Sequence, residues 1–278
     1  MKQTTLHHRR VTRRKFTADC AMLLAGIALG AAPRLAAQTA PAPAGPASPQ
    51  LVEDLVAAYR ILADHGVLDA YGHVSARHDR DPDRYLLSRS RGPELVTADD
   101  ILAYDLDNNP VDDKGGTLRK ERFIHGEIYK VRPDVKAIVH CHTPSLIPFG
   151  ISTVPLQPVY HMAAFLWEGV PVFEIREAAG RKMTNMLVGN PMLGQALART
   201  LGSKPAALMR GHGAVVVGPS IRMAVGRSIY MAINATLQNQ AIGLGGDVTY
   251  IDPEEGRLTT LDEYRRGWET WKRRAMAK

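Results

Sequence analysis

From residue 48 onward, segments with helical patterning alternate with segments with strand patterning, and this mixed order limits the folds open to the chain. The first predicted helix is framed by Ser48 as its N-cap, Pro49 in its first turn and Gly66 as its stop. Between these residues, apolar side chains recur three and four positions apart, which predicts one buried helix face.

The rest of the chain continues this alternation and has no internal repeat. We expect strands at 73–77, 85–88, 101–106, 136–142 and 170–175, with a strand pair around 210–213. We expect further helices at 120–131, 192–201, 220–242 and from residue 261. This mixed order predicts an α/β layered domain in which helices flank a central sheet.

Most of the net charge lies in the first 37 residues. They contribute +6 of the formal net charge of +7 at pH 7. The remaining chain therefore lacks the basic excess that is typical of nucleic-acid or anionic-membrane binding. Once these first 37 residues are removed as a leader, we expect neither nucleic acid nor a membrane as a partner, and we expect a small-molecule substrate.

The leader has the order of a secretory signal, because a basic segment precedes a short apolar segment and small residues up to Ala37. Arg13 and Arg14, followed by Lys15 and Phe16, resemble a twin-arginine signal, which implies export of a folded chain to the periplasm or the medium. An uncleaved anchor is the alternative, but about a dozen apolar residues fall short of the ~20 that a span needs. The predicted organisation is a signal peptide over 1–37, a Pro/Ala-rich linker over 38–50 and one domain over 51–278.

The predicted strand 136–142 places His140 and His142 two residues apart in an apolar run. Because side chains on a strand alternate between its faces, both imidazoles share one face and Cys141 points to the other. Cys20 is removed with the leader, so Cys141 is then the single cysteine and no intramolecular disulfide can form.

A third histidine, His212, lies between Gly211 and Gly213, which allow a sharp bend and a close approach of the backbone to a ligand. Taken singly, each histidine also has a structural reading, as a hydrogen-bonded core residue or an ordinary loop residue. Together, three neutral imidazoles with an open coordination position favour a catalytic divalent metal. We expect Zn²⁺, with Mn, Fe or Co as alternatives.

Glu121 and His125 lie four residues apart in the predicted helix 120–131, so they share a helix face and can point at the same site. If the neighbouring Phe123 and Ile124 bury Glu121, we expect its pKa to be raised. The alternative is an ordinary surface carboxylate on a helix.

Glu121 and His125, the run RPDVKAIVHCHTP and the later run RGHGAVVVG resemble the class II aldolase/adducin family over about residues 50–250. The resemblance implies a three-layer α/β/α fold with a largely antiparallel central sheet. It also implies assembly as a homo-oligomer, commonly a tetramer, with sites at subunit interfaces. By the same resemblance, the metal ligands are His140, His142 and His212, and the catalytic acid/base is Glu121.

The reaction that such a site supports follows from its chemistry. A divalent metal that chelates neighbouring substrate oxygens withdraws electrons and stabilises an enolate. Retro-aldol cleavage and decarboxylation of an oxo or hydroxy acid both fit, and they differ in whether an aldehyde or carbon dioxide leaves. In either case Glu121 would carry the proton.

Departures from the family's sugar-phosphate aldolases bear on the substrate. Where those enzymes have small phosphate-binding residues, this chain has His73 for an asparagine, Arg89-Ser90, and Arg119-Lys120 immediately before the catalytic glutamate. The planar fork of an arginine suits a carboxylate as well as a phosphate. We therefore expect a carboxylate-bearing substrate and a decarboxylase-like member acting on carboxylated aromatic-pathway intermediates. The alternative is that Arg119 and Lys120 are solvated residues at a helix start.

The candidate substrate-binding residues are Arg119, Lys120, Ser88, Arg89, Ser90, His73, Tyr160 and His161. Each of the two histidines among them can donate to a substrate oxygen, ligate the metal or serve structure alone. Competing functions are a sugar-phosphate aldolase or epimerase, an iron-dependent oxygenase and a non-catalytic adducin-like module. The complete set of three histidines and a glutamate argues against the last of these.

Overall fold

The structure is a computed structural model that describes residues 45–111, 115–259 and 264–277. The predicted signal peptide, residues 1–37, lies outside the described residues, as do residues 38–44 of the predicted linker. Among the described residues, no helix combines the length and apolar character needed to cross a membrane. The domain described below lies within residues 43–278, one compact unit of the chain.

The first helix, α1 (Pro49–Asp64), begins and ends where the sequence predicts. The Ser48 side chain accepts a hydrogen bond from the backbone N–H of Leu51 at 3.3 Å, so it caps the helix. Gly66 follows the helix with a φ of +67°, in the left-handed region that glycine adopts without steric cost. The apolar face of α1 is buried against the sheet, as its three-and-four spacing predicts.

A seven-stranded sheet forms the centre of the domain, in the order β3-β2-β1-β4-β7-β6-β5. Every neighbouring pair is antiparallel except β5 and β6, which are parallel, so the predicted largely antiparallel sheet is confirmed. The strands are β1 (His73–Arg77), β2 (Arg84–Ser88), β3 (Ile101–Asp105), β4 (Ala137–Cys141), β5 (Val172–Phe173), β6 (Ala206–Met209) and β7 (Gly213–Gly218).

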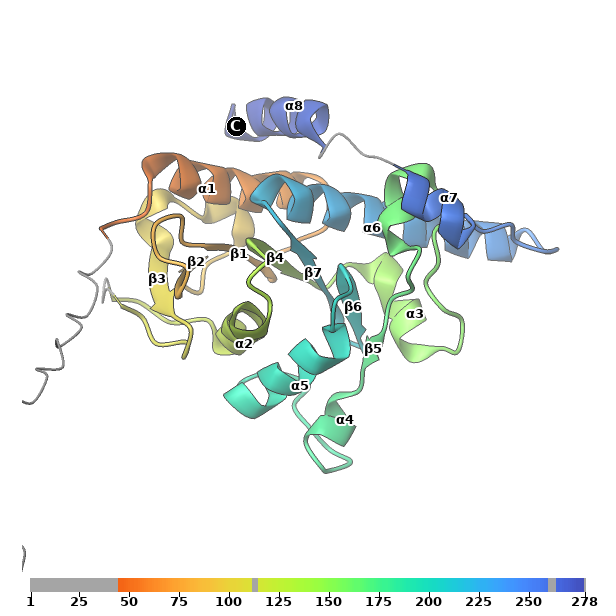
Figure 1. Cartoon of the computed structure of the whole chain (residues 1–278), viewed down its shortest axis with the longest axis horizontal. Coiled ribbons are helices and arrows are strands. Elements are labelled where there is room, and N and C mark those ends of the chain that lie inside the picture. Colours follow the sequence, from red (N-terminus) through yellow and green to blue (C-terminus); the bar gives the residue numbers. More distant parts are fainter. Residues whose placement is uncertain (1–44, 112–114, 260–263, 278) are drawn as a thin grey trace, which may run out of the picture. The chain divides into compact units, whose positions relative to one another are not determined.

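Helices lie on both faces of this sheet (Figure 1). The α-helices after α1 are α2 (Phe123–Val131), α3 (Ile147–Ile151), α4 (Ile175–Ala178), α5 (Pro191–Leu201), α6 (Ile221–Gly243), α7 (Pro253–Leu258) and α8 (Arg265–Met276). Short 3-10 turns complete the chain: η1 (Pro93–Leu95), η2 (Ala98–Asp100), η3 (Lys120–Arg122), η4 (Pro144–Leu146) and η5 (His161–Leu166).

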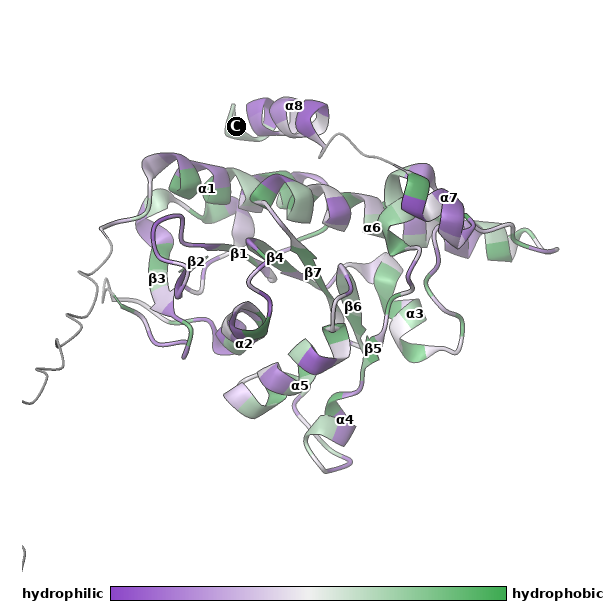
Figure 2. Ribbon diagram, viewed as in Figure 1, coloured by the Kyte–Doolittle hydropathy of each residue, from purple (hydrophilic) through white to green (hydrophobic). Residues whose placement is uncertain are grey.

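Two hydrophobic cores separate the three layers. Val139 and Cys141 of β4 point toward α1 and α6, whereas Ile138 points toward α2 and α5. Strands β4, β6 and β7 are strongly apolar, whereas α8 is mostly hydrophilic (Figure 2). Because each face of the sheet buries its own set of side chains against helices, the predicted α/β/α sandwich is confirmed.

The strand expected over 170–175 is much shorter in the structure, where β5 covers Val172 and Phe173 alone. Glu174 turns the chain into α4 by accepting a hydrogen bond from the backbone N–H of Arg176. The same carboxylate forms an ion pair with Arg210. Since β5 pairs only with β6 at the edge of the sheet, few ladder bonds oppose this early end.

The charged C-terminal helix is anchored to α1. Lys272 forms ion pairs with Glu53 and Asp54, and Arg274 forms one with Asp64. The helix α8 begins at Arg265, and of the start predicted from residue 261, positions 261–263 lie outside the described residues.

Candidate metal centre

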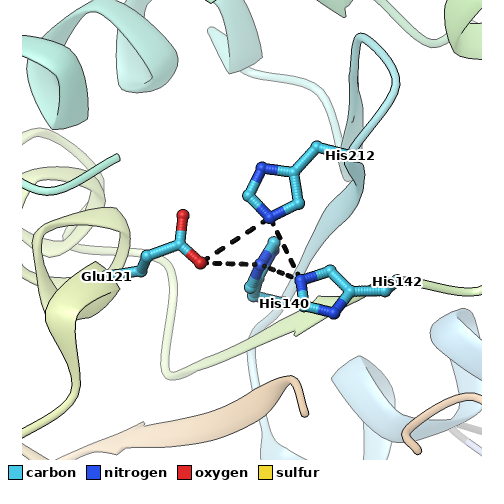
Figure 3. A group of neighbouring side chains, drawn as sticks. All are labelled: Glu121, His140, His142 and His212. Carbon is cyan, nitrogen blue, oxygen red and sulfur yellow. Dashed lines mark hydrogen bonds and ion pairs between the residues drawn. The ribbon is translucent and has the colours of Figure 1, made fainter. Parts of the chain in front are cut away.

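Four side chains from three separate parts of the chain meet on the α2 side of the sheet (Figure 3). His140 lies on β4 and His142 follows the end of that strand. His212 lies in the turn between β6 and β7, and Glu121 lies in η3. The pairing of β4 with β7 brings the turn that carries His212 beside the end of β4.

The ligand atoms of these four residues all lie within 4.8 Å of one another. The Nε2 atom of His142 is 3.1 Å from the Nε2 atoms of both His140 and His212. One carboxylate oxygen of Glu121, Oε2, is 3.5 Å from His140 Nε2 and 3.6 Å from His212 Nε2. The grouping of the three histidines and Glu121 agrees with the sequence prediction.

This geometry fits a divalent cation. Nitrogen ligands about 2.0–2.1 Å from a tetrahedral zinc ion stand about 3.3 Å from one another, close to the 3.1 Å that separates His142 Nε2 from the Nε2 atoms of His140 and His212. Three imidazoles and one carboxylate oxygen also form a donor set that zinc and related divalent ions bind.

Hydrogen bonding and burial keep the imidazoles in the form that can bind a cation. The Nδ1 atom of His140 lies 3.1 Å from the Ala214 carbonyl oxygen, which can only accept, so Nδ1 carries the proton and the Nε2 lone pair faces the cluster. Burial lowers the pKa of His142, and His140 lowers it further. Burial and His140 together lower the pKa of His212 to about 4, although Glu121 opposes this shift. Both side chains are therefore neutral near pH 7.

The two glycines beside His212 have separate structural roles. Gly211 has a φ of +60°, which suits the tight turn from β6 to β7. Gly213 packs onto β4 so closely that a Cβ at this position would overlap the Cys141 carbonyl oxygen. The close approach expected from the sequence is therefore made to the neighbouring strand, and it holds His212 beside His142.

Glu121 is oriented from its other side. Its Oε1 atom accepts a hydrogen bond of 2.9 Å from the backbone N–H of Val188, which leaves Oε2 facing the imidazoles. Burial would raise the pKa of Glu121, but its electrostatic interactions with the neighbouring His140 and His212 and the hydrogen bond from the Val188 N–H outweigh burial and lower the pKa to about 2. The expected rise in this pKa is therefore wrong, and Glu121 is ionised at neutral pH.

The expectation that Glu121 and His125 share one helix face is also wrong. The helix predicted over 120–131 is divided into η3 and α2, because Glu121 has non-helical angles of φ −94° and ψ 22°. His125 lies in α2, fully buried, and bonds to His73 and Ser75. It therefore lies outside the group of four ligand candidates.

Arg119 is a buried cation with a fixed position. Its Nε and Nη2 atoms donate to the hydroxyl oxygen of Ser88 at 3.1 and 2.8 Å, and Nη2 also donates to the Arg91 carbonyl at 2.7 Å. The Ser88 hydroxyl in turn donates to Tyr59. Arg119 is only 8% exposed, so it is not a solvated residue at a helix start. Ser88 holds Arg119 in place, with its hydroxyl committed to protein partners.

The other predicted cations and donors of this region lie at the surface or are paired. Lys120 and Ser90 are exposed. Arg89 forms an ion pair with Asp100 at 2.8 Å. No contact within the described parts of the chain joins these three residues to the metal-ligand candidates.

His73 lies next to the candidate centre, whereas Tyr160 and His161 have other neighbours. His73 on β1 faces His140 on β4, and their ring centroids are 4.9 Å apart. The Tyr160 ring contacts His161 and Tyr230 of α6, 5.0 and 6.0 Å away between centroids. Of the three candidates, the structure joins only His73 to the centre by a described contact.

Two features of the site gave no usable sequence signal. Val188 acts through its backbone N–H, which any residue except proline provides. The hydrogen bonds of Ser75 and Tyr129 to the His73 neighbourhood depend on which residues α2 places over β1. Neither feature has a spacing that a motif could reveal.

Comparison with known proteins agrees with this geometry. The family profile described as "Class II Aldolase and Adducin N-terminal domain" matches residues 53–239. Decarboxylase tropJ of Talaromyces stipitatus is 32% identical over 246 residues, which cover 80% of this chain and 92% of the relative. A 3,4-dihydroxyphthalate decarboxylase of Arthrobacter keyseri is 32% identical over 207 residues, covering 70% of this chain and 79% of the relative.

Solved structures support the fold. An aldolase II superfamily protein from Pseudomonas syringae matches with a TM-score of 0.69 at 21% identity, covering 83% of this chain and 94% of that one.

Proposed function

Because this chain belongs to the class II aldolase and adducin family, we propose that it is a divalent-metal-dependent decarboxylase of an aromatic acid with neighbouring hydroxyl groups. At a coarser level it is an enzyme, a lyase of the decarboxylase or aldolase kind. The observation that carries the proposal is the convergence of three imidazoles and one ionised carboxylate, with a buried arginine two residues before that carboxylate in the sequence. The names of the relatives favour carbon dioxide over an aldehyde as the leaving group.

His140, His142 and His212 would hold the metal ion, with Zn²⁺ as the first candidate and Mn, Fe or Co as alternatives. A divalent ion bound there would withdraw electrons from two neighbouring substrate oxygens and so stabilise the enolate left when a carbon–carbon bond breaks. A substrate with vicinal hydroxyl groups offers two such oxygens at the right separation for chelation.

Glu121 would move the proton. Because its pKa is lowered to about 2, Glu121 begins the reaction as a carboxylate and can accept a proton at Oε2 from a substrate hydroxyl. It then returns this proton to the ring carbon that bears the carboxylate. The bond to the carboxylate breaks, its electron pair enters the ring and ends on the oxygen, and carbon dioxide leaves. The oxygen finally regains a proton from water, so atoms and charges balance.

Arg119 would bind a carboxylate of the substrate. Its guanidinium is held rigidly by Ser88 and the Arg91 carbonyl, while no described residue accepts a hydrogen bond from its Nη1 atom. A fixed guanidinium loses little conformational freedom when it pairs with a carboxylate. No described residue contributes a carboxylate to Arg119, and a substrate carboxylate would complete the pair.

The test compares metal content with the released product. Leaderless protein purified without chelator or nickel resin is expected to carry near-stoichiometric metal by plasma mass spectrometry and to release carbon dioxide from 3,4-dihydroxyphthalate. His142→Ala is expected to lose both, whereas His65→Ala, which changes a histidine beside α8 and outside the cluster, keeps both. Oxygen consumption would instead indicate an oxygenase, and aldehyde release from a sugar phosphate would indicate an aldolase. A metal-free wild type, even after reconstitution, would refute the proposal.

A further inference from the structure

A continuous chain of buried hydrogen bonds leads from α2 to the edge of the metal centre. The Tyr129 hydroxyl is 2.8 Å from Ser75 Oγ, and Ser75 Oγ is 2.6 Å from His125 Nδ1. His125 Nε2 is 2.6 Å from His73 Nδ1, and the His73 ring lies beside His140. All four members of the chain are at most 5% exposed. The mechanism above uses none of these side chains.

Tyr129 sets the direction of this chain. Among the described residues, its hydroxyl has Ser75 as its one hydrogen-bond partner. Burial raises the pKa of Tyr129, so the phenol keeps its proton. A buried hydroxyl proton without an acceptor is costly. Tyr129 therefore donates to Ser75, and Ser75 must direct its own proton elsewhere.

The remaining protons follow one by one. Ser75 donates to His125 Nδ1, which leaves the single proton of the neutral His125 on Nε2. His125 Nε2–H then donates to His73 Nδ1, so the proton of His73 lies on its Nε2 atom. Both imidazoles are neutral in this arrangement, because the Nδ1 atom of each accepts a hydrogen bond and therefore carries no proton. His73 therefore presents an N–H, whereas His140 presents a lone pair.

We propose that the relay Tyr129–Ser75–His125 fixes His73 as a hydrogen-bond donor to the substrate carboxylate and not as a fourth metal ligand. This inference rests on the proposed function for the identity of the ligand. A protonated Nε2 has no lone pair for a cation, so the centre keeps an open position, as catalytic sites require. Among the described residues, the His73 ring has a hydrogen bond through Nδ1, to His125, and its Nε2 atom is left for a ligand.

The neutral charge of His73 also suits decarboxylation. The carboxylate loses its negative charge as carbon dioxide forms, so a second full cation would stabilise the bound substrate more than the transition state. A neutral N–H also orients the carboxylate, but it stabilises the bound substrate relative to the transition state by less than a full cation does. Tyr129, Ser75 and His125 are positioning residues, because they act only through His73.

A pair of substitutions at His73 tests the donor. The amide nitrogen of glutamine reaches the place of Nε2, whereas that of asparagine reaches only the place of Nδ1. We expect His73→Gln to keep KM for 3,4-dihydroxyphthalate within a few-fold of wild type, and His73→Asn to raise KM about ten- to a hundredfold. Both variants should keep full metal content. Metal loss in both would show that His73 is a ligand, and equal KM values would remove the donor role.

The relay itself is tested by histidine nitrogen NMR on the zinc-loaded protein, with His73 assigned from the His73→Gln variant. We expect protonated Nε2 and bare Nδ1 for His73. Tyr129→Phe removes the donor to Ser75, so the hydrogen bonds of the relay can also run in the opposite direction. His73 should then show a mixture of both tautomers, and KM should rise. Tyr85→Phe is the matched control, because Tyr85 is buried 5.4 Å from the Tyr129 ring but bonds to Asn108. The tautomer of His73 in the Tyr85→Phe variant should match that in the wild type.

A bare Nε2 on His73 in the wild type would overturn the relay. This readout needs no turnover, so it also separates the two proposals. If no hydroxylated aromatic acid releases carbon dioxide but His73 shows the expected tautomer, the proposed function fails and the directed chain stands.

Discussion

Replacing Glu121 by glutamine isolates proton transfer from the other roles of this residue. Glutamine has almost the same size, and its amide oxygen can keep the 2.9 Å hydrogen bond from Val188 N–H. Its amide nitrogen would occupy the place of Oε2, 3.5 Å from His140 Nε2, but an amide cannot accept and return a proton. The three imidazoles remain, so metal retention should be largely preserved.

The expected loss follows from the role that Glu121 has in the reaction. A positioned acid/base group contributes about 10²- to 10⁴-fold to a rate. This range equals about 3–5 kcal/mol of activation free energy, at about 1.4 kcal/mol for each factor of ten. We expect kcat for release of carbon dioxide to fall by this factor. We expect KM to change little, because the chelating and carboxylate-binding groups are unchanged.

The assay combines released carbon dioxide with metal content on the same sample. Glu168→Gln serves as the control, because Glu168 forms a surface ion pair with Lys204. Its activity should equal wild type. Full activity in Glu121→Gln with metal retained would refute Glu121 as the proton carrier. Loss of metal together with activity would show instead that the carboxylate is needed as a ligand.

Three further predictions test other parts of the site. Arg119→Ser should raise KM for carboxylated substrates at least about tenfold, since a charged hydrogen bond is lost. Lys120→Ser, at the neighbouring exposed position, should leave KM unchanged. Equal effects of the two substitutions on KM would contradict the carboxylate-binding role of Arg119. Gly213→Ala should lower the free energy of unfolding, measured by urea denaturation, by about 3 kcal/mol, because the new Cβ would overlap the Cys141 carbonyl. Gly243→Ala should leave the free energy of unfolding unchanged, because nothing lies near a Cβ at that position. Similar changes in both variants would contradict the close packing of β7 on β4. Metal-free protein should lose stability as the pH falls from 6.5 toward 4, because burial and His140 lower the pKa of His212 to about 4, so the unfolded chain takes up a proton before the folded chain does. Thermal melts should show a melting temperature that falls with pH over this range. His212→Asn should make the melting temperature depend less on pH.

Local patterns in the sequence were enough to place several elements. Ser48, Pro49 and Gly66 delimit α1 because capping and turn preferences act over a few residues. The shared face of His140 and His142 follows from the alternation of a strand, and Cys141 indeed lies in the opposite core. Where a distant partner competes, local patterning fails. Glu121 has non-helical backbone angles, and its carboxylate bonds to the distant Val188 N–H, so its expected pairing with His125 on one helix face does not exist.

The sequence by itself determined which chemical groups are available, namely three imidazoles, the carboxylate of Glu121 and the cation of Arg119 two residues before it. It also determined the α/β order of the elements. Only the tertiary structure decided which of these groups meet. His212 reaches His142 across 70 residues because β7 pairs with β4. Likewise, α2 packing over β1 gives His73 its hydrogen-bonded neighbours. Periodicity reports which face a residue occupies, whereas contacts between distant segments depend on strand register and layer packing, which a single sequence does not encode in any local pattern.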